Sequence, residues 1–232
     1  MRQGFSCETG FEHKERLEVL IVFDDGLAPI YPNAFTYMGD LGLKGTVYTI
    51  TDLVGVGGYL NLTQLNEMND AGWTIGNHTD NHTNLYETSL ENQIARIGNA
   101  KTWLNDNGFE DGQYHLAYPY GGYDDTTDIA MNNLNMKTGR HSREGSNSPS
   151  PNWKRLYSIM PKNNMTVSDC LSYADNCITT NKIGIFSFHN IVTTIPETWQ
   201  WNKTDFESLI DDLVVRNAEF LSISELYSKY GS

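Results

Sequence analysis

The chain has 232 residues, of which 39% are hydrophobic and 19% are charged, and its formal net charge is −13 at pH 7. This length and composition are typical of one large globular domain. A strongly negative chain repels phosphate backbones, so we expect no binding to nucleic acid. No apolar run reaches the roughly 18 residues that a membrane span needs. Residues 1–7 lack the apolar stretch of a signal peptide, and we expect none there.

Short β-rich runs alternate with amphipathic stretches along almost the whole chain. In the first half we expect four strands, at residues 17–23, 45–51, 73–76 and 115–118. Three helices are expected between them, at 31–41, 62–71 and 88–107. Gly72 and Gly108 are the expected stops of the second and third helices. Residues 54–60 carry three glycines and are predicted to form a loop.

The second half continues the same alternation. Four more strands are expected, at 135–139, 155–160, 183–188 and 220–222. Helices are expected at 124–134, 166–180, 204–217 and 224–230. The helix expected at 166–180 should be capped by Thr166 or Ser168. Residues 142–152 are rich in Ser, Asn and Pro and are predicted to form a surface loop.

Repeated βα units predict a parallel sheet covered by helices. Seven or eight such units favour a closed or nearly closed α/β barrel. We expect it to occupy residues 17–232 as a single catalytic domain, with residues 1–16 as an N-terminal extension. In barrels of this kind the active site lies at the carboxyl ends of the strands.

Polar side chains stand at these strand ends. Asp24 and Asp25 end the first strand, and His78 and His82 follow the third. Two imidazoles and two carboxylates are enough to hold one divalent metal with three protein ligands and to leave one carboxylate free. We assign Asp25, His78 and His82 as the metal ligands and Asp24 as the general base. Both aspartates reach one pocket only if the chain turns after them, and Gly26 permits such a turn.

His189 ends the seventh predicted strand and is the candidate general acid, because an imidazole can protonate a leaving amine near neutral pH. The predicted reaction is metal-assisted hydrolysis of an amide or ester. Each signal alone is weak: an Asp-Asp-Gly is most often a turn, and a lone histidine is more often a satisfied core or surface residue. Their conjunction, in order and at strand ends, favours a catalytic site.

Four segments together resemble the successive motifs of the polysaccharide deacetylase family (NodB homology domain, carbohydrate esterase family 4). They are Val22–Gly26, His78–His82, Tyr118–Gly121 and Phe186–His189. The resemblance implies a distorted (β/α) barrel, a zinc-type divalent ion, and removal of acetyl groups from N-acetylated sugars or, in some members, of O-acetyl groups from xylan. It also implies that Tyr120 donates its backbone N–H to the tetrahedral oxyanion.

The chain departs from the family pattern at two points. Many members begin the third motif with an arginine that holds the base carboxylate, and here that position is Ala117. We expect Arg140, just past the fifth strand, to emerge on the same face and to take its place. The Asp-x-x-Trp motif of the family is not evident, so the group that tunes His189 is unassigned.

Aromatic and sulfur-bearing side chains leave alternatives open. Trp199 and Trp201 follow His189 in a polar segment, where they could stack on sugar rings or pack against the next helix. Cys170 and Cys177 could pair, but buried free thiols are the favoured interpretation.

The leading hypothesis is therefore a metal-dependent deacetylase of a polymer that contains N-acetylglucosamine, acting outside the cell or in its envelope. One alternative is a degenerate carbohydrate-binding domain without turnover, motivated by the missing arginine and the missing Asp-x-x-Trp motif. Others are an O-acetyl xylan esterase and an amidohydrolase of a small non-sugar amide. An open groove would favour a polymer and a closed pocket a small amide. The sequence leaves the oligomeric state open.

Overall fold

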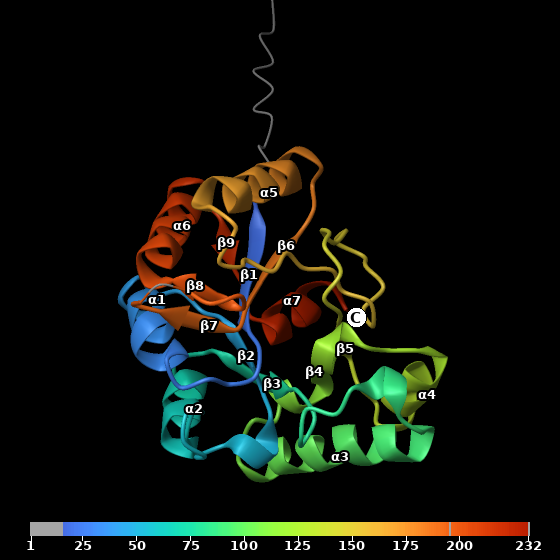
Figure 1. Cartoon of the computed structure of the whole chain (residues 1–232). Helices are drawn as coiled ribbons and strands as arrows, with labels where there is room; N and C mark the ends of the chain where they lie inside the picture. The colour runs from blue at the N-terminus through green and yellow to red at the C-terminus, as the bar shows by residue number, and fades with distance from the viewer. Residues whose placement is uncertain (1–15, 195, 232) are drawn as a thin grey trace, which may run out of the picture.

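The protein is described by a computed structural model that covers residues 16–194 and 196–231. Its centre is a curled parallel sheet with the strand order β5-β4-β3-β2-β1-β6, and β9 pairs with the start of β1 (Figure 1). The strands are β1 (Glu18–Phe23), β2 (Thr46–Thr49), β3 (Thr74–Asn77), β4 (His115–Ala117), β5 (Thr138–Arg140), β6 (Gly184–Phe188) and β9 (Glu219–Phe220). The predicted parallel (β/α) barrel is thereby confirmed.

Helices surround the strands, as Figure 1 shows. They are α1 (Thr36–Asp40), α2 (Leu62–Asp70), α3 (Leu90–Asp106), α4 (Asp125–Asn133), α5 (Val167–Thr179), α6 (Lys203–Val215) and α7 (Ile223–Tyr230). The predicted stops are confirmed, because Gly72 and Gly108 follow α2 and α3 with φ of +86°. Thr166 caps α5, where its hydroxyl accepts a hydrogen bond from the backbone N–H of Asp169. No described helix has the length and apolarity that a bilayer crossing requires.

Side chains of the sheet alternate between the barrel interior and the helical layer, as the pleat requires. Val19 and Ile21 of β1 point outward into the cluster that packs against the helices. Leu20 and Val22 point inward and pack in a second cluster with Leu226 of α7. The barrel is thus filled by side chains and covered at its amino-terminal end by α7.

Residues 155–160, expected to form a strand, do not form a continuous one. They make two isolated parallel bridges, from Leu156 to Arg140 of β5 and from Ile159 to Phe186 of β6. The segment therefore bonds to both edge strands of the sheet and links them, although the break between the bridges interrupts the ladder. The helix expected at 31–41 is also divided, into a π-helical turn (Tyr31–Phe35) followed by α1.

A small parallel pair, β7 (Asn190–Val192) and β8 (Gln200–Asn202), lies between β6 and α6 along the chain and was not predicted. Its strands are three residues long, too short for a periodicity signal. Short 3-10 turns complete the described structure at Thr51–Leu53, Leu85–Glu87, Gly112–Tyr114 and Pro119–Gly121. The proposed N-terminal extension, apart from Arg16, lies outside the described residues.

Candidate active site

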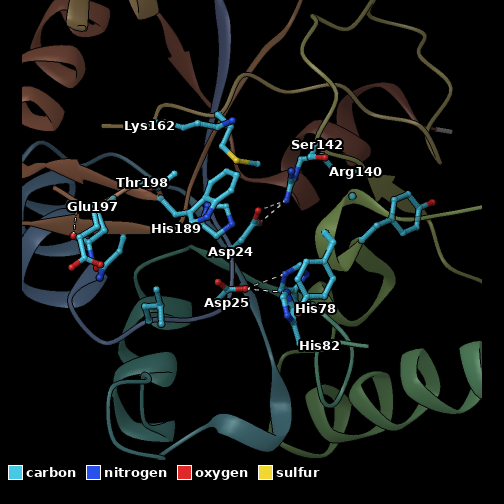
Figure 2. A pocket seen from close by; sticks show the side chains of 18 of the residues that line it. Asp24, Asp25, His78, His82, Arg140, Ser142, Lys162, His189, Glu197 and Thr198 are labelled. Atoms are coloured by element: carbon cyan, nitrogen blue, oxygen red, sulfur yellow. Dashed lines mark hydrogen bonds and ion pairs between the residues drawn. The ribbon is translucent and has the colours of Figure 1, made fainter. Parts of the chain in front are cut away.

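The alternation of the strands brings the polar residues of the site to one place. Asp24 continues the inward set of Leu20 and Val22 beyond the end of β1. On β6 the inward set begins with Ile185 and is followed by Ser187 and His189. The same two-residue period gives these side chains a shared orientation although they come from opposite ends of the sequence. Figure 2 shows Asp24 and His189 in the cavity at the carboxyl ends of the strands.

Asp25 breaks this alternation and still reaches the cavity. Its backbone is left-handed, with φ of +69°, and Gly26 follows with φ of +74°. The sequence placed the turn at Gly26, but the turn already begins at Asp25. A left-handed backbone is uncommon for a residue with a side chain, and such strain concentrates at functional sites. The strained turn lets two consecutive carboxylates line one cavity.

Asp25, His78 and His82 form the one group of metal-binding side chains found among the described residues. The Oδ1 atom of Asp25 lies 3.3 Å from the Nε2 atom of each histidine (Figure 2). A tetrahedral ion with ligand distances of about 2.1 Å separates its donor atoms by about 3.4 Å, which matches this spacing. The same Oδ1 atom is buried and has no hydrogen-bond donor among the described residues. The donor set therefore fits a divalent cation.

The two imidazoles are prepared for this role by their surroundings. The Nδ1 atom of His78 lies 2.8 Å from the carbonyl oxygen of Ala117, so its N–H donates there and Nε2 faces Asp25 with a free lone pair. Burial and the neighbouring His78 lower the pKa of His82 to about 4, so His82 is neutral at pH 7. Burial opposes ionisation of Asp25, but the nearby imidazoles, His78 first among them, outweigh it and lower the pKa of Asp25 to about 2.

Asp24 has its own partners, separate from the candidate metal ligands. One terminal nitrogen of Arg140 lies 2.6 Å and 2.7 Å from its two carboxylate oxygens, and the hydroxyl of Ser187 donates to Oδ2 at 3.1 Å. Asp24 and Arg140 are each only 3% exposed. Burial alone would raise the pKa of Asp24, but the Arg140 guanidinium outweighs it and lowers the pKa. The structure thus brings Arg140 to the carboxylate that the sequence paired it with.

Of the remaining predicted residues, Tyr120, His189 and Trp199 line a cavity of about 800 Å³. Tyr120 lines it with its ring centroid 4.5 Å from that of His82. On the other side of β1, Trp199 lines it with its ring centroid 5.6 Å from that of His189. Lys162 extends over the Trp199 ring at 4.7 Å from its centroid.

Trp201 does not reach the cavity, and the expectation that it contacts substrate is wrong for this structure. It is 2% exposed, packs against Phe188, and its indole N–H donates to the carbonyl oxygen of Met165. The reason is the alternation of β8, which turns Trp201 into the core while Gln200 and Asn202 stay half-buried. Cys170 and Cys177 are both free and buried, as favoured.

Sequence reasoning missed several residues that line the cavity or support it, among them Ser187, Lys162 and Glu197. Ser187 could have been found, because it is the single polar residue within an apolar strand and shares the inward side with His189. Lys162 and Glu197 lie in irregular segments that carry no period, and nothing in the sequence places them at the rim.

The comparisons with known proteins agree with this geometry. The profile of the family described as "Polysaccharide deacetylase" matches residues 12–139, more than half of the chain. The chain belongs to the polysaccharide deacetylase family. The matched region includes both aspartates, both histidines of the candidate metal site and Tyr120, and it ends before Arg140 and His189.

Individual relatives cover parts of the chain. The poly-beta-1,6-N-acetyl-D-glucosamine N-deacetylase of Staphylococcus epidermidis is 28% identical over 159 residues, which cover 62% of this chain and 55% of that protein. The chain spans about half the length of the curated relatives that it matches.

Solved structures share the fold. The Streptococcus pyogenes deacetylase PplD, solved with acetate, has a TM-score of 0.63 and 29% identity, covering 67% of this chain and 69% of its own. The Xyl-CE4 domain of a multidomain xylanase from the hindgut metagenome of Trinervitermes trinervoides has a TM-score of 0.64. It is 17% identical and covers 94% of this chain and 92% of its own, which supports the fold alone.

Proposed function

We propose that this chain is a metal-dependent hydrolase that removes N-acetyl groups from a glycan containing N-acetylglucosamine. The observation that carries the proposal is the separation of two carboxylates with different partners in one cavity. Asp25 faces the imidazoles of His78 and His82, while Asp24 is bound to Arg140. One carboxylate is thus suited to hold a cation and the other to accept a proton.

A divalent ion, with zinc as the best match to the two histidines and one carboxylate, would act as a Lewis acid on the acetyl carbonyl and as an activator of water. Asp24 takes the proton of the attacking water at a carboxylate oxygen. His189, which follows β6 on the opposite side of β1 from His78 and His82, gives a proton to the leaving amine. The backbone N–H of Tyr120 stabilises the oxyanion of the tetrahedral intermediate.

Arg140 is the positioning residue for this chemistry. The family motif places an arginine at the position that Ala117 occupies here, and Arg140 reaches Asp24 from the neighbouring strand β5. A buried guanidinium keeps the base ionised and limits its rotation. Ala117 contributes instead through its carbonyl oxygen, which orients His78.

The substrate proposal rests on the relative named as a poly-beta-1,6-N-acetyl-D-glucosamine N-deacetylase. A polymer of this kind lies outside the cell or in its envelope, and we propose that the chain acts there. The rim carries two carboxylates, Glu144 and Glu197, against one ammonium, Lys162, and this excess of negative charge favours neutral over anionic sugars.

The test is acetate release from N-acetylglucosamine oligomers by zinc-loaded protein, beside a metal-stripped sample and a sample reloaded with zinc. Acetate that disappears on stripping and returns on reloading supports the proposal. Acetate release that is independent of metal contradicts it. If no acetate forms, O-acetylated xylan and small amides are assayed next, and glycan binding without any turnover would identify a binding domain.

A further inference from the structure

Asp80 is a buried carboxylate that the proposed chemistry does not use. It lies midway along the segment from His78 to His82, called the histidine loop below, and is only 4% exposed. Both histidines line the cavity, but Asp80 does not. Among the described residues, the group able to share an ion also leaves Asp80 out. Its burial needs another explanation, because a buried charge is costly unless it is paired.

Asp80 is bound to helix α3 by three hydrogen bonds. Its Oδ2 atom accepts from Nη1 of Arg96 at 3.1 Å and from the side-chain amide of Asn99 at 2.8 Å. Its backbone N–H donates to the carbonyl oxygen of Arg96 at 3.2 Å. Arg96 and Asn99 are three positions apart, so their side chains lie on the same face of the helix. The middle of the histidine loop is therefore fixed to a helix of 17 residues.

The histidine loop needs support because its backbone is strained at two positions. Thr79 has φ of +63° and His82 has φ of +62°, left-handed values that cost free energy in residues with a side chain. The backbone N–H groups of Thr51 and Asp52 donate to the carbonyl oxygens of Thr79 and Asp80, at 3.3 Å and 2.9 Å. These bonds hold the loop to the 3-10 turn after β2, and the bonds of Asp80 hold it to α3.

The geometry of the candidate ligands depends on this loop. His78 and His82 each place Nε2 3.3 Å from Oδ1 of Asp25, as Figure 2 shows. Asp25 belongs to the separate turn after β1, so the spacing of the three donor atoms depends on how the histidine loop is set against the sheet. A rotation of the backbone at Asp80 would move His82 relative to His78. Groups that orient the ligands typically change metal affinity by about 10–100-fold when they are mutated.

We infer that Asp80 is a positioning residue for the metal site and that it acts through Arg96 and Asn99 of α3. The buried ion pair holds the histidine loop in the conformation that binds the ion, so less free energy is lost in ordering the loop on binding. The inference rests on the proposed function for the presence of a metal. It adds the residues outside the ligand set that determine how tightly the metal is held.

The test measures zinc affinity by competition with a chromophoric chelator and requires no turnover. We expect Asp80→Ala to weaken zinc binding by about 10–100-fold. Asp80→Asn, which keeps one oxygen that can accept from Arg96 or Asn99, should show a smaller loss. Arg96→Met and Asn99→Ala each remove one side-chain bond to the carboxylate and should also weaken zinc binding less than Asp80→Ala does.

Asp128→Ala is the matched control. Asp128 also forms an ion pair with an arginine, Arg155, but neither residue lines the cavity or belongs to the histidine loop. This variant should keep the zinc affinity of the wild type.

Urea unfolding of the metal-free proteins measures stability separately, because removing one partner of a buried ion pair also destabilises the fold. Arg96→Met leaves the buried carboxylate of Asp80 unpaired. The double variant Asp80→Ala with Arg96→Met leaves neither charge unpaired, so it should regain part of the stability that Arg96→Met loses. Its zinc affinity should stay low, because the side-chain connection between the histidine loop and α3 is still missing.

Two results would overturn the inference while zinc-dependent acetate release still supported the proposed function. One is wild-type zinc affinity in Asp80→Ala, and the other is a double variant whose zinc affinity recovers together with its stability. A wild type that binds zinc but releases no acetate from any acetylated substrate would contradict the proposed function, and weaker zinc binding in Asp80→Ala would then still support the role of Asp80. A wild type that binds no zinc would contradict both.

Discussion

Each end of the barrel buries a histidine, and the two histidines have different partners. His78 follows β3 at the carboxyl end, with one nitrogen facing Asp25 and the other bound to a backbone carbonyl. His115 begins β4 at the amino-terminal end, where Nδ1 lies 3.0 Å from the hydroxyl of Thr138 and the ring packs against Tyr227 of α7. Burial therefore does not distinguish a candidate metal ligand from a structural histidine. What distinguishes His78 is its second ring nitrogen, Nε2, which faces another candidate ligand atom, Oδ1 of Asp25, at 3.3 Å.

The backbone shows the same contrast. Non-glycine residues with positive φ gather in the loops at the carboxyl end, namely Asp25, Thr79, His82 and Tyr120. The others are three asparagines that each follow the last turn of a helix, where a left-handed residue commonly ends the helix. At the helix ends the left-handed backbone occurs at asparagine, which tolerates it. At the site it occurs at residues such as Asp25 and His82, whose side chains line the cavity.

Removing His78 should have the largest effect of any single change at the site. We expect His78→Ala to lose both bound metal and activity, because only two of the three ligands remain. Elemental analysis after dialysis against zinc measures the metal, and acetate release measures the activity. His115→Asn is the matched control and should keep a full equivalent of metal. Stoichiometric metal in His78→Ala would remove His78 from the ligand set.

Changing the base should separate metal binding from catalysis. Asp24→Asn keeps the shape of the side chain and one oxygen that can accept from Arg140, but it cannot accept the proton, so we expect kcat to fall by about 10²–10⁴ with metal content unchanged. Asp128→Asn, which changes a carboxylate outside the cavity, should keep its activity. Retained turnover in Asp24→Asn would exclude Asp24 as the base.

Removing Arg140 should affect both stability and the pH profile. Arg140→Met leaves the Asp24 carboxylate buried without its cation, which costs about 3–5 kcal/mol of unfolding free energy. The pKa of Asp24 should rise, so the acidic limb of the pH–rate profile moves to higher pH. Urea unfolding and a pH–rate series measure these effects.

Two further variants control for this change. Arg155→Met removes an arginine whose carboxylate partner, Asp128, is partly exposed, and should cost less. The double variant Asp24→Asn with Arg140→Met should recover part of the lost stability, since no charge is then left unpaired. An unchanged pH–rate profile in Arg140→Met would show that Arg140 does not tune the base.

The sequence predicted the parts of the site that are encoded by local patterns. The strand before Asp24 and the strand before His78 are apolar runs that end in polar residues. Because parallel strands have their carboxyl ends at the same end of the barrel, these polar residues were expected to lie close together. The position of Arg140 opposite Asp24 was also expected, although its direct contact depends on the curvature of the sheet over 116 residues of sequence separation. That curvature has no local signal.

The rim was predictable only in part, and the two tryptophans show why. Trp199 and Trp201 have the same residue type and nearly the same sequence surroundings, yet one is half exposed at the cavity and the other is in the core. The difference arises from β8, a strand of three residues whose pairing with β7 sets which side chain turns inward. A pattern of that length could not be assigned from sequence, so both interpretations remained open until the pairing was known.

The smallest predicted effect concerns the amino-terminal end of the barrel. Burial lowers the pKa of His115 to about 3, below the usual value of 6.5. Between these two values the unfolded chain binds a proton that the folded chain does not, so this residue makes stability fall as pH drops, by at most about 1.4 kcal/mol per pH unit. In His115→Asn, which can keep a hydrogen bond to Thr138, the decline in unfolding free energy from pH 6.5 towards pH 4 should be shallower by that amount. Urea unfolding at a series of pH values measures it, and identical slopes in both proteins would mean that His115 is protonated inside the fold.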